Sequence, residues 1–446
     1  MDKDTLIKGY MNFLDNGKTE RRCVISVIEM AKACGFRDIE TVDTLKSGDK
    51  VYVNKMGKSI MLFKIGSEDI SKGMNILGAH IDSPRLDAKQ NPIYEKDGIV
   101  YLNTHYYGGI KKYQWLALPL ALNGFVFLSD GTKIDVNIGD DPEDPVFCIS
   151  DILPHIAQEQ MKKPASEFVN AENLDVIIGC SNKDDVVEDK EENPAKNKVL
   201  KLLKDKYGFE EKDFISAEIE IVPAGKTRYS GIDKSLILGY GHDDRVCAYS
   251  SVMALLEDNN SKRTLCCILS DKEEVSSAGA TGMNSHLLDN AVAEVVARLC
   301  NCPNQELIIR RALRNSYMLS SDVNSAYDPL NYLLYDKQNS SFLGRGVVFN
   351  KYTGSRGKVG ASDANPEFIA KLRSYLEKDN VVFQTAELAK VDIGGGGTIA
   401  HYAAEYGMEV IDCGVSVMSM HAPWELISSY DLYQAYLCYK SFLNII

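Results

Sequence analysis

The sequence predicts an α/β protein whose sheet is interrupted by an inserted β-rich segment. Strand-like apolar runs followed by loops and helical stretches occur near the N-terminus and again from residue 235 onward. Between residues 89 and 234 the pattern changes to short β-like runs separated by turn residues. A chain of 446 residues is long for one hydrophobic core, so two domains are expected. Alternating strands and helices are typical of an α/β sheet.

The first eighty residues contain the elements that lead into this sheet. Apolar residues recur at helical spacing up to about residue 40, which predicts two helices. The segment 51–66, VYVNKMGKSIMLFKIG, alternates around a glycine-containing turn and predicts a hairpin. Met74, Ile76 and Leu77 form a short apolar run, which predicts a buried strand leading to His80.

The rest of the chain divides into an insertion and a return to the α/β pattern. The β-like runs of the insertion are GIVYLNT, GFVFLS, KIDVNIG, LDVIIG and AEIEIV. Further along, LILGYG, TLCCILS and EVIDCG each precede a loop or a helix, and a last helix extends through YDLYQAYLCYKSFL. We therefore expect residues 1–88 and 235–446 to form one domain and residues 89–234 to form an inserted β-rich domain.

Composition and charge argue against several classes of partner. The net charge is −13, whereas proteins that bind nucleic acid or anionic membranes usually carry a basic face. No apolar run approaches the roughly 20 residues of a membrane span, and MDKDTLIKGY lacks the apolar core of a signal peptide. The eleven cysteines include no CxxC pair, which is typical of reduced thiols in the cytosol. We expect a cytoplasmic protein that binds neither nucleic acid nor membranes.

Five apolar segments end at side chains that can bind a metal ion. His80 follows the first segment, and Asp82 comes two residues later in GAHIDSPRLD. The other four segments lead to Asp243 and Asp244 in GYGHDDR, Glu273 and Glu274 in SDKEE, Asp322 in SSDVN, and His421 in SMHAPWE. If all five are parallel strands of one sheet, these side chains meet at a single edge. Only seven histidines occur in the chain, and two lie at such ends.

Two imidazoles and three carboxylates suit a pair of metal sites with one bridging carboxylate and a shared water molecule. Mixed nitrogen and oxygen ligands favour Zn²⁺, and Co²⁺ or Mn²⁺ are compatible with them. If Glu274 binds metal, Glu273 is close enough to take a proton from the bound water and return it to a leaving amine. Asp82 is placed to hold the far nitrogen of His80.

Each motif also has a purely structural interpretation. A His-x-Asp pair after a strand can be a hydrogen-bonded loop pair, and Asp243 with Asp244 can cap a helix. Glu273 and Glu274 can be solvent-facing charges, and His421 can be held in a turn. The occurrence of all five motifs in one order favours the metal-site interpretation.

The ordered motifs resemble those of the aspartyl aminopeptidase family of dinuclear zinc metallopeptidases. GAHIDSP, the two aspartates after GYGH, DKEEVSS, SSD and SVMSMH occur in that order, and the resemblance covers nearly the whole chain. It implies a zinc-peptidase-like catalytic α/β/α sandwich with an inserted β-rich dimerisation domain. It also implies a large, tetrahedral homododecamer that encloses its active sites.

The resemblance implies a role for each of these residues. The ligands of two divalent ions, most simply zinc, would be His80, Asp243, Glu274, Asp322 and His421. Asp243 would bridge the ions, and its bond to Asp244 would be a cis peptide. Asp82 would orient His80. Glu273 would be the general base.

Substrate contacts are less sharply indicated. His155, in ILPHIAQEQ, matches a family histidine that reaches toward the reacting carbonyl from a neighbouring subunit, but it is equally compatible with an exposed helix histidine. The segment GGGGTIAH (394–401) is richer in glycine than in many family members, so the backbone at Gly396 can approach a ligand closely or form a flexible turn. The basic candidates for binding an acidic first residue are Lys351, Arg356, Lys358 and Lys390, each also compatible with plain surface charge.

The sequence therefore predicts a cytoplasmic metalloaminopeptidase that removes N-terminal residues from peptides by means of a dinuclear metal-activated water. The substrate needs a free N-terminus, and Asp and Glu are candidate first residues. One alternative is a metal-dependent amidohydrolase or carboxypeptidase on the same scaffold. Another is a non-catalytic assembly protein, whose expected mark, the loss of a ligand or of the base, is absent here.

Overall fold

The computed structural model describes residues 1–182, 192–258, 261–300, 303–354 and 356–446, which form two compact units. The sandwich unit consists of Met1–Ser83, Thr227–Met420 and Glu425–Ile446. The insert unit consists of Pro84–Lys226 and His421–Trp424. The unit boundaries precede the predicted ones at 88/89 and 234/235, because the strands that begin at Arg85 and Arg228 already belong to the next unit. The division of the chain into two domains at 88/89 and 234/235 stays a prediction.

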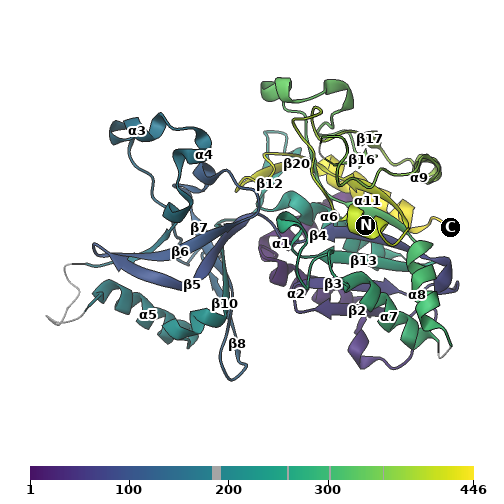
Figure 1. Cartoon of the computed structure of the whole chain (residues 1–446), viewed down its shortest axis with the longest axis horizontal. Helices are drawn as coiled ribbons and strands as arrows, with labels where there is room; N and C mark the ends of the chain where they lie inside the picture. The colour runs from purple at the N-terminus through teal and green to yellow at the C-terminus, as the bar shows by residue number, and fades with distance from the viewer. Residues whose placement is uncertain (183–191, 259–260, 301–302, 355) are drawn as a thin grey trace. The chain divides into compact units, whose positions relative to one another are not determined.

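A nine-stranded sheet forms the centre of the sandwich unit (Figure 1). In spatial order its strands are β1 (Arg37–Asp38), β2 (Lys50–Lys55), β3 (Ser59–Lys64), β13 (Thr264–Ser270), β4 (Met74–His80), β14 (Tyr317–Ser321), β18 (Glu409–Gly414), β16 (Val347–Asn350) and β17 (Phe383–Thr385). The four strands β13, β4, β14 and β18 are mutually parallel. β2 and β3 form the predicted hairpin. The carboxyl ends of β13, β4 and β14 therefore share one edge of the sheet.

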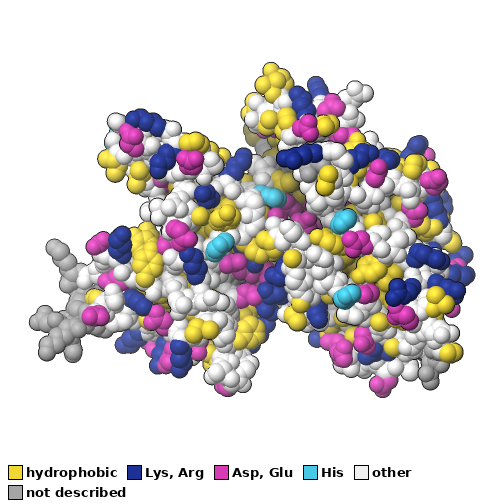
Figure 2. Space-filling view, in the orientation of Figure 1, with side chains coloured by type: hydrophobic (Ala, Val, Ile, Leu, Met, Phe, Trp, Pro, Cys, Tyr) yellow, Lys and Arg dark blue, Asp and Glu magenta, His cyan; other side chains and the backbone are white. Residues whose placement is uncertain are grey.

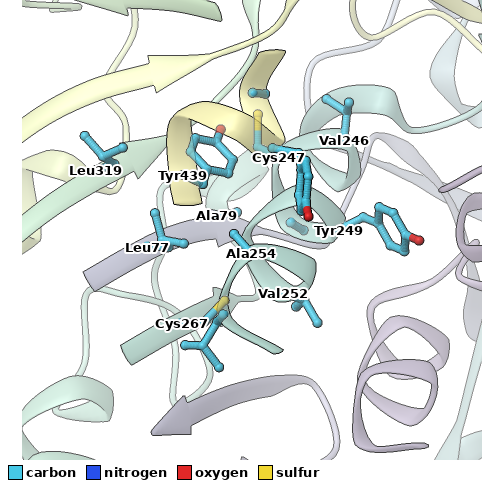
Figure 3. Packing of buried hydrophobic residues seen from close by; sticks show 14 of the residues in the cluster. Leu77, Ala79, Val246, Cys247, Tyr249, Val252, Ala254, Cys267, Leu319 and Tyr439 are labelled. Carbon is cyan, nitrogen blue, oxygen red and sulfur yellow. The ribbon is translucent and has the colours of Figure 1, made fainter. Parts of the chain in front are cut away.

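Helices cover both faces of this sheet. One face packs against α1 (Lys3–Asn16), α2 (Glu20–Ala33), α6 (His242–Glu257), α9 (Pro366–Lys378) and α11 (Ser429–Leu443), and the other against α7 (Leu287–Leu299), α8 (Gln305–Arg314) and α10 (Ala400–Ala404). β4 serves both cores, because Leu77 and Ala79 pack on the first face while Met74 and Ile76 pack on the second. Figure 3 shows Leu77 and Ala79 next to α6. The unit is an α/β/α sandwich, as predicted, and the two predicted N-terminal helices are α1 and α2.

A second, five-stranded sheet in the same unit corrects one prediction. Its strands, in spatial order, are β11 (Arg228–Ser230), β12 (Leu236–Gly239), β20 (Glu425–Ser428), β19 (Ser416–Met418) and β15 (Asn324–Ser325). LILGYG forms β12, which pairs antiparallel with β11 and β20, and the segment before His421 leaves the central sheet after β18 to form β19. The expectation that all five apolar segments end at one edge of one parallel sheet is therefore wrong for these two. An apolar run indicates burial but not which strands it pairs with.

The insert unit contains a six-stranded antiparallel sheet. In spatial order its strands are β8 (Lys133–Ile138), β7 (Leu120–Phe127), β10 (Ala217–Pro223), β5 (Arg85–Lys96), β6 (Ile99–Tyr107) and β9 (Val176–Cys180). The unit also holds the helices α3 (Gln158–Met161), α4 (Ala165–Phe168) and α5 (Pro194–Tyr207). All five predicted β-like runs fall within this sheet, and α5 packs on it through Val199, Leu200 and Leu203. A role of this unit in dimerisation stays a prediction.

Three global features bear on the expectations from composition. No helix among the described residues is both long and apolar enough to cross a membrane. Acidic and basic side chains are interspersed over the face of the chain seen in Figure 2. Nine cysteines in the described part of the chain are free, but Cys300 is disulfide-bonded, so the expectation of reduced thiols is wrong for Cys300.

Candidate metal centre

His80 ends β4 with its imidazole buried at the carboxyl edge of the central sheet. Its Nδ1 lies 3.0 Å from the backbone oxygen of Asp82. A carbonyl oxygen only accepts, so Nδ1 carries a proton and donates it there. Nε2 then faces three carboxylates, with Asp243 Oδ1 at 3.1 Å and Glu273 Oε2 and Asp322 Oδ1 each at 3.9 Å. In the neutral ring this nitrogen presents a lone pair, which is the form that binds metal.

Asp82 holds several parts of the cluster at once. Its carboxylate accepts the backbone N–H of Glu273 at Oδ1 and the N–H of Glu274 at Oδ2, each at 3.2 Å. Its backbone oxygen fixes the ring of His80 as described, and the whole residue is buried. One side chain therefore aligns the turn that presents both glutamates, while its backbone selects the histidine tautomer. These contacts support the prediction that Asp82 orients His80, which stays a prediction.

Asp243 reaches the cluster from the start of α6 rather than from the end of a central strand. Its backbone N–H donates to Glu425 Oε2 at 3.0 Å, and its carbonyl accepts the Ser83 hydroxyl at 2.7 Å. The bond to Asp244 is a cis peptide, as the resemblance implies. These contacts fix the backbone on both sides of the Asp243 side chain, which is buried.

Asp322 follows β14 directly. Its N–H donates to the backbone oxygen of Cys413 at 3.1 Å. A Cβ on Gly414 would lie 1.7 Å from the backbone oxygen of Asp322, so only glycine fits where β18 passes this residue. Burial, together with the charge of Glu273, raises the pKa of the Asp322 carboxyl well above its ordinary value.

The cluster has the donor set that a divalent cation requires. Ligand atoms of His80, Glu273 and Asp322 lie within 4.8 Å of one another, and so do those of His80, Asp243 and Glu274. Burial lowers the pKa of His80, but hydrogen bonds to Asp243 and Asp82 outweigh burial and hold that pKa well above its ordinary value. Four carboxylates crowded around one imidazole repel one another unless positive charge lies between them. Mixed nitrogen and oxygen donors around that space fit Zn²⁺.

Two histidines named from the sequence belong to the insert unit. His421 donates Nδ1–H to the backbone oxygen of Gly109 at 2.9 Å, because that oxygen can only accept. His155 lies exposed on the 3-10 helix Pro154–Ile156. The role of His421 as a ligand and that of His155 in a neighbouring site stay predictions.

The lysines named from the sequence are already engaged within the sandwich unit. Lys351 and Lys358 both pair with Asp363, at 2.5 and 3.1 Å between Nζ and the carboxylate oxygens. Lys390 donates to the backbone oxygen of Leu333 at 2.8 Å. A nearby cavity of about 170 Å³ carries charges of both signs, from Arg356, Lys358, Lys390, Glu387 and Asp392. Apart from Gly396 itself and its two chain neighbours, no atom of the described residues lies within 4 Å of where a Cβ on Gly396 would stand, so its backbone borders open space there.

The sequence reasoning missed several residues that support these positions. Ser83 and Glu425 hold the backbone of Asp243, and although both lie inside quoted motifs, their residue types gave no indication of this contact. Asp412 is buried in β18 and accepts the Thr398 hydroxyl at 2.6 Å, which anchors the end of the glycine-rich segment. In register it stands beside Ser320, two residues before Asp322. Burial raises the pKa of Asp412 to about 7.

Residues 13–443 match the family described as Aminopeptidase I zinc metalloprotease (M18). The chain belongs to the M18 family. It is 54% identical over 439 residues to a probable M18 family aminopeptidase 1 of Clostridium acetobutylicum, covering 98% of this chain and 93% of the relative. A Thermotoga maritima relative with the same description is 42% identical over 437 residues, covering 98% of this chain and 95% of its own length.

Solved M18 structures share the whole fold. The crystal structure of an M18 aminopeptidase from Thermotoga maritima superposes with a TM-score of 0.95 at 41% identity, over 100% of this chain and 97% of that one. Aminopeptidase I from Clostridium acetobutylicum gives 0.90 at 53% identity, over 97% and 94%. The dodecamer of S. cerevisiae mApe1 gives 0.78 at 20% identity, over 99% and 96%, which is a likeness of fold alone.

The M18 chain is thus a zinc metalloprotease that acts as an aminopeptidase and hydrolyses peptide bonds. The predicted family, fold class and activity are confirmed. A carboxypeptidase, an amidohydrolase and a non-catalytic assembly protein are not favoured by these matches.

Proposed function

We propose that the enzyme uses two divalent ions, held by His80, Asp243, Glu274, Asp322 and His421. Glu273 acts as the proton shuttle, and Asp82 positions His80 and the two glutamates. The observation that carries this proposal is the direction of His80. Its Nδ1–H is donated to Asp82 O, so Nε2 is the nitrogen that can bind a metal ion, and it lies within 4 Å of carboxylate oxygens of Asp243, Glu273 and Asp322.

When bound, the ions would polarise the scissile carbonyl and lower the pKa of a water molecule. Glu273 would take the proton of the attacking water on its carboxylate and deliver it to the leaving amine. Its backbone N–H is held by Asp82, and its side chain is only 16% exposed, so the carboxylate is positioned and largely shielded from competing water. The neighbouring Glu274 and Asp322 would remain ionised as ligands.

The substrate we propose is a peptide with a free N-terminus and a neutral first residue. A strong preference for Asp or Glu would require uncompensated positive charge near the first side chain. The lysine candidates Lys351 and Lys358 instead share Asp363. In the cavity of about 170 Å³, three cationic side chains face two acidic ones, and Asp363 adds a third acid by pairing with Lys358. The open backbone at Gly396 is proposed to lie along the peptide chain.

Assembly and cellular location follow the resemblance. We propose a homododecamer in which His155 completes a neighbouring site and the insert unit contributes dimer contacts. The exposed apolar side chains around His155, namely Ile152, Leu153 and Ile156, are consistent with burial in such a contact. We also propose a cytoplasmic location, because nine cysteines of the described residues are free thiols.

The test compares two neighbouring substitutions with the same chemistry, Glu273→Gln and Glu274→Gln. We expect Glu273→Gln to keep close to the wild-type metal content and to lower kcat by about 10²–10⁴-fold, the range for a lost general base. Glu274→Gln removes a ligand and should lower metal content itself. Metal content by mass spectrometry and initial rates on an aminoacyl reporter peptide are measured on the same samples.

The control is Glu306→Gln, which makes the same chemical change in an exposed pair with Arg310 on α8. It should leave both metal content and rate unchanged. Near-normal turnover in Glu273→Gln would remove Glu273 from the mechanism. Two ions per chain in the wild type are expected, and one ion per chain would reject the dinuclear assignment.

A further inference from the structure

A cavity of about 310 Å³ lies in the sandwich unit, apart from the residues of the metal cluster. It lies between α9 and the edge of the central sheet formed by β16 and β17, which are neighbours in Figure 1. Its volume is at the lower end of the range of roughly 300–1,000 Å³ that is usual for small-molecule sites. The cavity is therefore large enough for a compact ligand.

The wall of this cavity is apolar and partly aromatic. Its apolar lining comes from Phe349, Ile369, Leu372, Leu376, Phe383 and Ile411. The rings of Phe349 and Phe383 meet edge to face, with centroids 5.8 Å apart and planes at 82°. Such a surface suits the side chain of a branched aliphatic or aromatic amino acid.

Charged groups of both signs join this wall. Lys351 and Arg373 supply positive charge, and Glu387 supplies negative charge. Lys351 pairs with Asp363 and Arg373 with Glu377, and in both pairs the side chains are between 43% and 57% exposed. Exposed ion pairs contribute little stability, so both cations can turn to an incoming carboxylate. The half-buried Glu387 accepts a hydrogen bond from the Tyr352 hydroxyl and is suited to an ammonium group.

We propose that this cavity binds a free α-amino acid with an apolar side chain. The side chain occupies the apolar wall, the carboxylate contacts Lys351 and Arg373, and the ammonium group contacts Glu387. Free amino acids of this kind are products of an aminopeptidase, so the cavity is a site at which product regulates the enzyme. The binding of the amino acid uses only the aminopeptidase activity of the family, whereas its effect on the rate rests on the contact of the Gly396 segment with substrate that is proposed above.

The cavity shares residues with two segments that carry candidates for substrate contact, one with Lys351 and Lys358 and the other with Glu387 and Gly396. Lys351 begins the segment that carries Lys358, and Glu387 begins the segment that leads to Gly396. The Tyr352–Glu387 hydrogen bond links the two segments, and Asn350 Nδ2 donates to the backbone oxygen of Ala386 at 2.8 Å. A ligand that draws Lys351 away from Asp363 changes the contacts of both segments, and so alters peptide binding.

The experiment titrates the zinc-loaded enzyme with L-phenylalanine by calorimetry while a saturating peptide hydroxamate occupies the metal centre. We expect one L-phenylalanine to bind per chain under these conditions. N-acetyl-phenylalanine and phenethylamine, which lack one of the two charges, should bind at least tenfold more weakly. Initial rates on a reporter peptide should show an inhibition or activation by L-phenylalanine that is not competitive with the peptide.

Two variants locate the site. Ile369→Trp fills the cavity and should weaken binding at least tenfold, and Arg373→Ala should weaken it about tenfold without changing the basal rate. The matched control Arg310→Ala removes an exposed arginine from a similar helix pair on α8 and should bind as the wild type does. Should Ile369→Trp fail to fold, the exposed Arg373 variant decides. Loss of all L-phenylalanine binding when the hydroxamate is present, or wild-type affinity in Arg373→Ala, would overturn the proposal.

Discussion

The metal cluster and the two substrate segments, residues 351–363 and 386–397, place their charged groups in different ways. In the cluster, each carboxylate is held through its own backbone: Glu273 and Glu274 by Asp82, Asp243 by Glu425 and Ser83, and Asp322 by Cys413. These partners belong to strands, helices or turns of the sandwich core.

In the two segments several charged side chains are held by other side chains of the same segments. Lys351 and Lys358 meet on Asp363, and Tyr352 meets Glu387. The side chains of Lys351, Lys358 and Asp363 are each more than 40% exposed. The roles proposed above would therefore place the chemistry on positions fixed by the core, and the selection among substrates on weak, exchangeable surface pairs.

The largest expected effect comes from Asp82→Asn, which removes a contact that holds the metal cluster in place. An amide oxygen can accept only one of the two N–H groups of Glu273 and Glu274, and its NH₂ faces the other donor. We expect metal affinity to fall by about 10–100-fold, the usual cost of losing such a partner, and kcat/KM to fall with it. Competition with a metal-binding dye measures the affinity.

The control for Asp82→Asn is Asp69→Asn, which makes the same change at an exposed turn where Asp69 accepts the N–H of Ser71. It should retain wild-type metal affinity. Unchanged affinity in Asp82→Asn as well would mean that the backbone of the glutamate turn holds its position without Asp82.

A second, smaller effect concerns Asp412, which is buried in β18 and accepts the Thr398 hydroxyl just after the second segment. Burial raises its pKa to about 7, against about 3.9 in an unfolded chain. Between these values the folded state binds a proton that the unfolded state does not, so the free energy of unfolding falls as pH rises from about 4 to 7. Asp412→Asn removes this decline and should raise stability at pH 8 relative to pH 5 by on the order of 2–3 kcal/mol.

Chemical denaturation at pH 5 and pH 8 measures that difference. Thr398→Val serves as the partner variant, because the Thr398 hydroxyl lowers the pKa of Asp412 and its loss should steepen the decline. An identical pH dependence in wild type and Asp412→Asn would show that Asp412 is ionised at little cost in the folded protein.

The fold and the cluster were predictable to the extent that short motifs follow buried strands. His80, Glu273 and Asp322 lie at the carboxyl ends of β4, β13 and β14, which are parallel neighbours, so the expectation of a shared sheet edge is correct for these three residues. Asp243 comes close by a different route, from β12 of the second sheet and the start of α6. The ordered motifs indicated the family correctly, although the sheet assumed for the Asp243 segment was wrong, and the role of Asp243 as a ligand stays a prediction.

The supporting contacts could not be predicted, because they join residues far apart in sequence and of ordinary type. Nothing in the sequence singles out Glu425, which is 182 residues from Asp243, or Asp412 as the anchor of Thr398. The pairing of Lys351 and Lys358 with Asp363 is local, but it depends on the path of a loop that has no regular period. Candidate ligands can therefore be named from the sequence, whereas the pairing of charged side chains at a site can be seen only in the structure.

The smallest expected effect comes from Asp363→Asn, which removes the exposed ion pairs with Lys351 and Lys358. Removing this carboxylate leaves Lys351 and Lys358 without their shared partner, so the segment gains net positive charge. We expect kcat/KM for an Asp- or Glu-reporter to rise relative to a Leu-reporter by up to about fivefold, the scale of an exposed ion pair. The rise should shrink at high ionic strength, because exposed charges are screened.

Asp379→Asn, at the exposed C-terminus of α9, makes the same change of net charge at a residue outside the pairs of Lys351 and Lys358 with Asp363, and should leave the ratio unchanged. Metal content should stay at the wild-type level in both variants, which separates a change of selectivity from damage to the cluster. An unchanged Asp/Leu ratio in Asp363→Asn, with both lysines intact, would mean that they do not face the first side chain of the peptide. The remaining basic candidates for contact with the first side chain would then be Arg356 and Lys390, which line the same cavity of about 170 Å³ as Lys358.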